Sequence, residues 1–142
     1  MEYESYHRNP INKFIHTICI PLIVITTINF VRMLTKNINK MNTEMFILIL
    51  TLYYLKEYNF FIWSVMLTYY LSAIIISDIW MIKRHQHKIE TVIVFTTAWI
   101  MQFIGHYIEG NRPALFDSIT TSFTQAPLYS LNNVINLSLK DI

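Results

Sequence analysis

Three histidines lie where apolar segments of this chain begin or end. His7 and His16 are near the start of the sequence, and His106 is at the end of a long apolar stretch. Titratable side chains at membrane depth are costly and usually mark a working site. Imidazole rings bind metal ions and transfer protons near neutral pH. These positions therefore predict a membrane-embedded metal or proton-transfer site.

The first histidine segment carries a possible orienting group. Asn12 and His16 are four residues apart, so they share a face if the segment is helical. The Asn12 amide could then orient the His16 ring by a hydrogen bond and leave the other ring nitrogen for a metal. The structural alternative for His16 is an interface histidine that bonds a neighbouring helix.

The last apolar segment carries a polar stripe. Trp99, Gln102, His106 and Glu109 are spaced by three, four and three residues, which places them on one face of a helix. The His106–Glu109 spacing resembles that of the imidazole and carboxylate pairs in di-iron bundles, in reversed order. A carboxylate with several histidines suits a non-haem Fe(II) site that keeps positions open for oxygen and substrate. The alternative for Glu109 is a simple ion pair with Arg112.

The composition predicts that much of this chain lies in lipid. Its 142 residues are 54% hydrophobic and 14% charged, whereas soluble domains average about 45–50% and about 25%. The net charge of +2 comes from scattered lysines and arginines, so no nucleic-acid partner is expected. Cys19 is the only cysteine, which excludes an intrachain disulfide and a cysteine metal cluster. We therefore expect membrane lipid to surround the protein.

Apolar segments and one tail make up the predicted elements. The first segment follows Asn9-Pro10, a pair typical of a helix start because Asn caps free N–H groups and Pro fits the first helical position. As a helix this segment would measure about 27 Å, close to the hydrocarbon thickness of a membrane. The second is short for a full crossing and fits a tilted, re-entrant or buried helix. The segments are residues 14–31, 45–55, 60–82 and 91–108, and the amphipathic tail, expected to lie at the interface, is 113–138.

We predict an all-α integral membrane bundle in one domain, residues 1–142, with about four transmembrane or re-entrant segments and an amphipathic C-terminal helix. An even number of crossings would return the chain to its starting side, where the three histidines could meet. The polar stretch 32–43 fits an exposed connection, and the basic stretch 83–88 fits a connection that faces solvent or lipid headgroups. Asp78 lies within the third segment, where an ionised carboxylate needs a partner. The alternative, because it is near the end of the segment, is a structural Asp that extends toward the membrane interface.

The two histidine motifs in this order resemble a known family, the small membrane proteins typified by the fungal 2-hydroxy fatty acid dioxygenase of fatty-acid α-oxidation. The resemblance runs from about Tyr3 to Val134, and Cys19 occupies a position where similar proteins commonly have glycine. The matching residues are Tyr6-His7, Asn12, His16, Pro21, Trp99, Gln102, Phe103-Ile104-Gly105-His106, Glu109, Pro113-Ala114-Leu115, Asp117 and Ala126-Pro127.

The resemblance implies an Fe(II)-dependent oxygenase of the endoplasmic reticulum membrane. Such an enzyme uses O2 to shorten a long-chain 2-hydroxy fatty acid by one carbon and releases CO2; its substrate arises from the sphingoid base phytosphingosine. The family's histidines carry over onto His7, His16 and His106 as Fe(II) ligands. Four further residues complete the expected site: Glu109 as a ligand or orienting group, Asn12 and Gln102 as partners of the ligands, and Arg112 as the cation that holds the substrate carboxylate.

A non-catalytic membrane scaffold or small channel is the alternative function. The histidines would then serve helix contacts or proton passage. Iron analysis of the purified protein separates the two, and the sequence predicts no particular oligomeric state.

Overall fold

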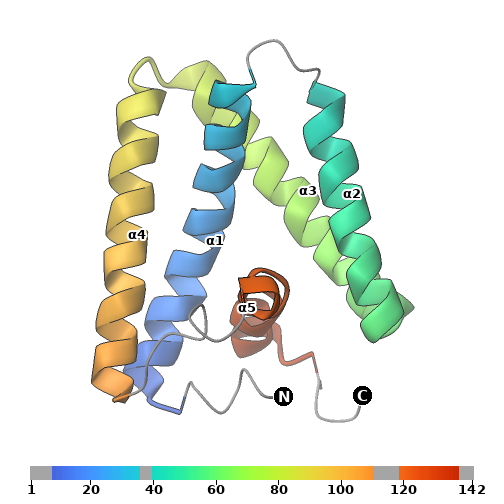
Figure 1. Ribbon diagram of the computed structural model, residues 1–142, viewed down its shortest axis with the longest axis vertical. Coiled ribbons are helices and arrows are strands. Elements are labelled where there is room, and N and C mark those ends of the chain that lie inside the picture. The colour runs from blue at the N-terminus through green and yellow to red at the C-terminus, as the bar shows by residue number, and fades with distance from the viewer. Residues whose placement is uncertain (1–7, 36–39, 111–118, 138–142) are drawn as a thin grey trace. The chain divides into compact units, whose positions relative to one another are not determined.

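The computed structural model describes residues 8–35, 40–110 and 119–137. These residues form helices with no strand among them, which confirms the all-α prediction. Three of the helices, α1, α3 and α4, are long and apolar enough to cross a membrane, so the chain is a helical membrane protein. The helices are α1 (Pro10–Leu34), α2 (Lys40–Glu57), α3 (Phe60–Lys83), α4 (His87–Glu109) and α5 (Ile119–Ile135) (Figure 1).

The helices begin and end at residues with clear capping roles. Asn9 Oδ1 accepts a hydrogen bond from Ile11 N at 2.9 Å, so α1 starts at Pro10 as predicted. Asn59 caps α3 in the same way, through a 2.9 Å bond from Ile62 N. At the end of α5, Asn136 has a positive φ of 46°, a left-handed conformation that Asn tolerates better than most residues.

The helices are longer than the apolar segments that predicted them. Helix α2, for example, covers Lys40–Glu57 where only 45–55 is strongly apolar. Lysine and glutamate at its ends support a helix while they lower its hydropathy. The predicted tail 113–138 contains α5, Ile119–Ile135, and its first residues lie outside the described ranges.

Contacts group the chain into two compact units. Unit 1 consists of residues 1–23 and 96–142, and unit 2 consists of residues 24–95. Helices α1 and α4 each contribute one half to each unit. A single domain over 1–142 stays a prediction.

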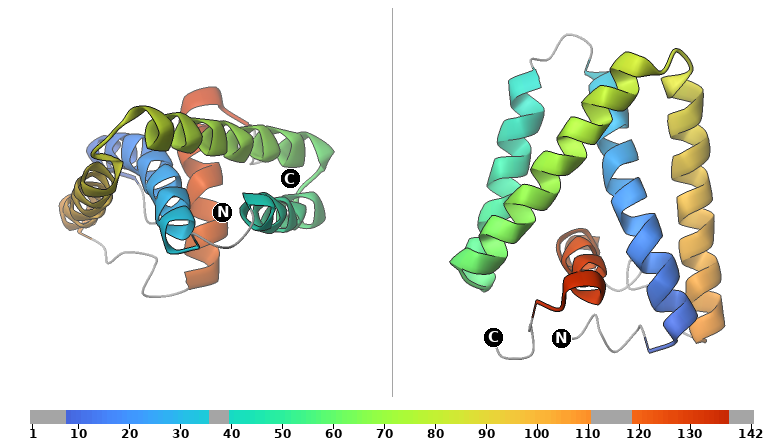
Figure 2. Two further views of the ribbon diagram at one scale, coloured as in Figure 1. Left: turned by 90° about the horizontal axis from the view of Figure 1, so that it is seen from above. Right: turned by 180° about the vertical axis from the view of Figure 1, so that it is seen from behind.

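In unit 1, the start of α1 packs against the end of α4. Ile15 and Cys19 on α1 form a buried cluster with Ala98 on α4, and both views of the ribbon show the two helices side by side (Figures 1 and 2). The Cys19 side chain is therefore accommodated within the helix contact. Helix α5 joins this unit through a 3.3 Å bond from Asn133 Nδ2 to Thr17 Oγ1.

The two helices of unit 1 run antiparallel. Asn12 contacts Glu109, and His16, one turn later on α1, contacts His106, almost one turn earlier on α4. If both helices cross the membrane, an even number of crossings must lie between them. Helix α3 supplies one crossing, and α2, with 18 residues and a length of about 27 Å, can supply the second.

Unit 2 has an aromatic and aliphatic core between α2 and α3. Tyr54 on α2 and Ile62 and Met66 on α3 are fully buried. The Tyr54 and Tyr70 hydroxyls lie 3.3 Å apart, so each phenol has a polar partner inside the core.

Unit 2 also contains a polar cluster that joins four helices. Arg32 forms ion pairs with Asp78 and, at 3.5 Å, with Glu44. Asn29 accepts a bond from Ser77 Oγ at 2.5 Å and donates one to Thr91 Oγ1 at 3.0 Å. We call this group the unit 2 polar cluster: Asn29, Arg32, Glu44, Ser77, Asp78 and Thr91.

The cluster corrects one prediction. Arg32 was expected in an exposed connection, but α1 continues to Leu34 and the Arg32 side chain is only 7% exposed. The reason is the charge on Asp78. A carboxylate within an apolar helix needs a counter-ion, and Arg32 is the cation that supplies it.

Candidate functional site

Four of the residues predicted for the site meet between α1 and α4 in unit 1. Asn12 and His16 come from α1, and Gln102 and His106 come from α4. Each is at most 6% exposed, although all four have polar side chains. The four-residue spacing on each helix directs both pairs to one side, and the antiparallel packing brings the two sides together. We call these four residues the histidine-pair site.

The two imidazoles face each other through the same nitrogen. His16 Nε2 and His106 Nε2 lie 3.2 Å apart, and the ring planes are nearly perpendicular, at 87°. His16 Nδ1 lies 3.0 Å from the backbone oxygen of Asn12. Because a carbonyl only accepts, His16 Nδ1 carries the proton and, in the neutral ring, Nε2 keeps its lone pair.

The orienting group differs in one detail from the prediction. Asn12 does orient His16, but through its backbone carbonyl and not through its side-chain amide. The amide donates instead to Glu109 Oε2 at 3.2 Å. One residue therefore links the ring of His16 to the end of α4.

The separation of the two nitrogens fits a shared metal ion. Two imidazole nitrogens bound to one ion at about 2.1 Å, with an angle of about 90–110° between the bonds, are about 3.0–3.4 Å apart. The observed 3.2 Å is within this range. Within residues 8–35, 40–110 and 119–137, no His, Cys, Asp or Glu completes a group of three. His7, the predicted third histidine ligand, lies outside these residues.

Glu109 holds the start of α1. Its carboxylate accepts bonds from the backbone N–H of Arg8 at 2.8 Å and of Asn9 at 2.7 Å, in addition to the Asn12 amide. Negative charge is favourable at a helix N-terminus, where N–H groups lack partners within the helix. Of the two roles predicted for Glu109, these contacts favour the orienting one. Glu109 therefore fixes the backbone of Arg8 and Asn9, directly before α1.

Gly105 permits the close approach of the two helices. A Cβ atom on this residue would lie 2.4 Å from Asn12 Oδ1, far inside normal contact. Small residues allow helix backbones to approach closely in membranes. The absence of a side chain at Gly105 therefore allows the Asn12 side chain to pack directly against the α4 backbone.

Two amide groups in the site have unused hydrogen-bonding capacity. Asn12 Oδ1 and Gln102 Nε2 are buried and have no hydrogen-bond partner among the described residues. A buried polar atom without a partner costs about 1–3 kcal/mol. We therefore expect water or a ligand to bond these atoms. Arg112, the predicted cation for the substrate carboxylate, lies outside the described residues.

Two groups of contacts were not anticipated from the sequence. The bonds from Arg8 N and Asn9 N to Glu109 had a local signal, because the N–H groups before a helix need an acceptor. The sequence did not identify which carboxylate would accept these hydrogen bonds. The unit 2 polar cluster had a signal in Asp78, a carboxylate in an apolar segment, but its partners lie on other helices.

Comparison with known proteins gives a consistent result. A family model described as "2-hydroxy-palmitic acid dioxygenase Mpo1-like" matches residues 1–137. The chain is 27% identical over 133 residues to the 2-hydroxy-palmitic acid dioxygenase MPO1 of Saccharomyces cerevisiae, an alignment that covers 89% of this chain and 72% of the yeast protein. No solved structure matches.

Proposed function

Because this chain belongs to the Mpo1-like family, we propose that it is an Fe(II)-dependent dioxygenase of long-chain 2-hydroxy fatty acids. The reaction converts R–CH(OH)–COOH and O2 into R–COOH, CO2 and H2O. The fatty acid therefore loses one carbon. The relative's name supports a 2-hydroxy fatty acid as substrate, and the facing nitrogens of His16 and His106 are the observation that supports a metal.

His16 and His106 would hold the iron through their Nε2 atoms, with His7 as the third histidine. The bond from His16 Nδ1 to the Asn12 carbonyl fixes the tautomer that metal binding requires. When bound, Fe(II) supplies electrons for O2 activation and free coordination positions for O2 and the hydroxy acid.

The other residues of the site orient the substrate and its ligands. Gln102 Nε2 is a buried donor that can bond the carboxylate or the 2-hydroxyl group of the substrate. Arg112 is proposed to pair with the carboxylate. The four residues of the histidine-pair site are buried, which limits water and strengthens these polar interactions.

The membrane supports this choice of substrate. A long acyl chain is itself a lipid component, and α1 and α4 are long and apolar enough to span the bilayer. The histidine-pair site lies near the ends of both helices. The polar head of the substrate could therefore stay near the interface while its tail stays in lipid. We place the protein in the endoplasmic reticulum membrane and the reaction in the degradation of phytosphingosine.

The test is turnover of a labelled substrate. Purified protein in vesicles is incubated with 2-hydroxypalmitate labelled at carbon 1, in the presence of Fe(II) and O2. We expect labelled CO2 and the fifteen-carbon acid in equal amounts, and no CO2 from palmitate, which lacks the hydroxyl group. The proposal is contradicted if protein purified under anaerobic conditions contains no iron, a result that would favour a scaffold or channel. It is also contradicted if palmitate releases as much CO2 as 2-hydroxypalmitate.

A further inference from the structure

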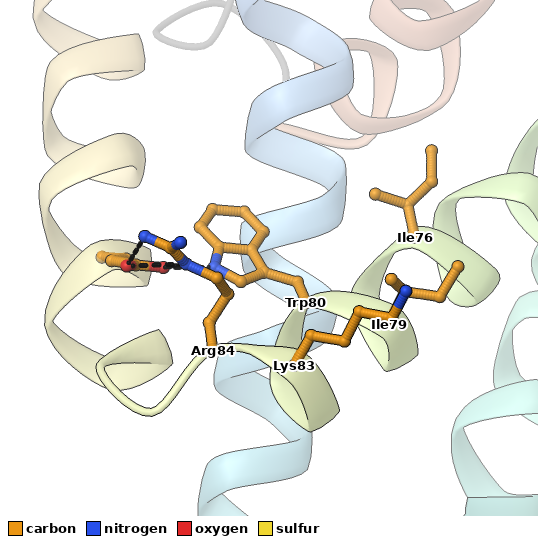
Figure 3. Close-up of a pocket in the computed structure, with 6 residues that line it drawn as sticks. Ile76, Ile79, Trp80, Lys83 and Arg84 are labelled. Carbon is orange, nitrogen blue, oxygen red and sulfur yellow. Dashed lines mark hydrogen bonds and ion pairs between the residues drawn. The ribbon is translucent and has the colours of Figure 1, made fainter.

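Unit 2 has an open groove at the end of α3 that the proposed function does not use. Its volume is about 490 Å³, within the range of small-molecule sites. Figure 3 shows its labelled residues on α3 and on the turn that follows it. The groove is lined by Ile76, Ile79, Trp80, Lys83, Arg84 and Glu90.

The α3 residues of the groove form a stripe that changes from apolar to basic. Ile76, Ile79 or Trp80, and Lys83 follow the three- and four-residue spacing of one helix face. The stripe rises about 10 Å along the helix axis. Ile76 and Ile79 are each 48% exposed on a helix long and apolar enough to span the membrane. Their exposed surface therefore fits contact with an acyl chain.

Glu90 neutralises one of the two cations at the groove. Its carboxylate accepts bonds from Arg84 Nη2 at 2.6 Å and from Arg84 Nε at 3.0 Å. It also accepts a 2.7 Å bond from the Trp80 indole, which fixes the position of this ring at the side of the groove. Figure 3 shows the Arg84 and Lys83 side chains extended in different directions.

Lys83 is therefore the cation left for a ligand. It is exposed, and its ammonium group makes no ion pair with any described residue. It is the last residue of α3, where a membrane helix reaches the headgroup region. Lys88, in the first turn of α4, adds a further positive charge at this end of the two helices, against the single carboxylate of Glu90.

We propose that this groove binds an anionic phospholipid, with its phosphate group at Lys83 and an acyl chain along Ile76 and Ile79. A soluble anion would use the lysine but leave the apolar stripe without a partner. A zwitterionic phospholipid would fill the stripe, but its headgroup has no net charge to balance Lys83. Basic residues next to a membrane span attract anionic lipids in general, and here the groove adds a specific apolar surface.

The test uses Trp80 as a fluorescent probe inside the groove. Trp63 and Trp99 are changed to phenylalanine, so Trp80 is the only tryptophan left. The full chain is placed in vesicles of phosphatidylcholine. One sample contains a small fraction of brominated phosphatidylglycerol, and the other contains the same fraction of brominated phosphatidylcholine. Bromine quenches tryptophan at contact. We expect phosphatidylglycerol to bind with a constant about fivefold higher than that of phosphatidylcholine, because one lysine near an anionic lipid has about this effect.

Three variants in this background separate a specific site from general attraction. Lys83→Gln should bring the two lipids to equal quenching, whereas Lys83→Arg keeps the charge and should keep the preference. Lys88→Gln removes an equal charge from the first turn of α4, outside the groove lining, and should retain most of the preference. The proposal is overturned by equal quenching in the parent protein, or by equal losses in the Lys83→Gln and Lys88→Gln variants.

Discussion

The unit 2 polar cluster and the histidine-pair site both place polar side chains between apolar helices, yet their chemistry differs. In the unit 2 polar cluster, opposite charges pair and donors meet acceptors, as in the Arg32–Asp78 ion pair and the bond from Ser77 to Asn29. In the histidine-pair site, two nitrogens of the same kind face each other at 3.2 Å. They need either a shared proton or a metal ion.

The difference separates stabilising polar groups from reactive ones. The unit 2 polar cluster pairs its charges, and only Arg32 Nε among its atoms is buried without a hydrogen-bond partner in the described residues, so its main value is in the packing of helices. A site that retains a buried donor, such as Gln102 Nε2, and a buried acceptor, such as Asn12 Oδ1, can gain free energy by binding a ligand. We therefore expect substitutions in the two regions to affect different measurements.

The largest effect is expected from His106→Ala. Loss of a ligand should lower turnover more than about 100-fold and remove most bound iron, because metal sites lose 10–100-fold even when only an orienting partner is changed. Turnover and iron per chain are measured on protein purified in detergent. His85→Ala, at an exposed position, is the matched control and should retain both. Normal iron content in His106→Ala would contradict the assigned ligand.

Arg32→Met should affect stability and not iron. It leaves the Asp78 carboxylate without its counter-ion. Because the Asp78 side chain is 31% exposed, we expect a cost below the about 3–5 kcal/mol of a fully buried pair. The double variant Arg32→Met/Asp78→Leu removes both charges and should recover most of the loss. Thermal unfolding in detergent gives the stability, and iron is measured per folded chain. If Arg32→Met loses iron without a change in Tm, the unit 2 polar cluster does not have the purely stabilising role that we assign to it.

Gly105→Ala should disturb the histidine-pair site by overlap. The new methyl group would meet Asn12 Oδ1 at 2.4 Å, and overpacking of this kind costs about 1–3 kcal/mol. The Tm should fall accordingly. Adding Asn12→Ala removes the overlapping atom, so the double variant should regain the Tm. If the double variant is less stable than Gly105→Ala alone, the close contact is not the cause.

Glu109→Gln should have the smallest effect. Glutamine keeps one acceptor oxygen for the N–H groups of Arg8 and Asn9 but loses the charge, so we expect about a tenfold lower kcat/KM. Iron should stay bound, because Glu109 accepts bonds from the backbone directly before α1 and from Asn12, which is an orienting role. Iron content in Glu109→Gln relative to the parent is the measurement. A loss as large as in His106→Ala would identify Glu109 as a ligand.

Much of the helical structure was predictable from local patterns. The start of α1 at Pro10 follows from Asn9-Pro10, and the apolar segments place the helices because each reflects neighbours in the sequence. The ends of α2 were harder to predict, because its terminal charged residues resemble those of a connection. Hydropathy measures how well a segment tolerates lipid and not where a helix ends.

The sequence by itself determined the helices, their lipid-compatible surfaces and the polar stripe that contains Gln102 and His106. These depend on residues within a few positions of each other. The tertiary structure decided which groups meet. His16 and His106 are 90 residues apart, and their contact depends on the antiparallel packing of α1 and α4. It also decided that Asn12 orients His16 through its backbone carbonyl, while its side-chain amide bonds Glu109 on the other helix.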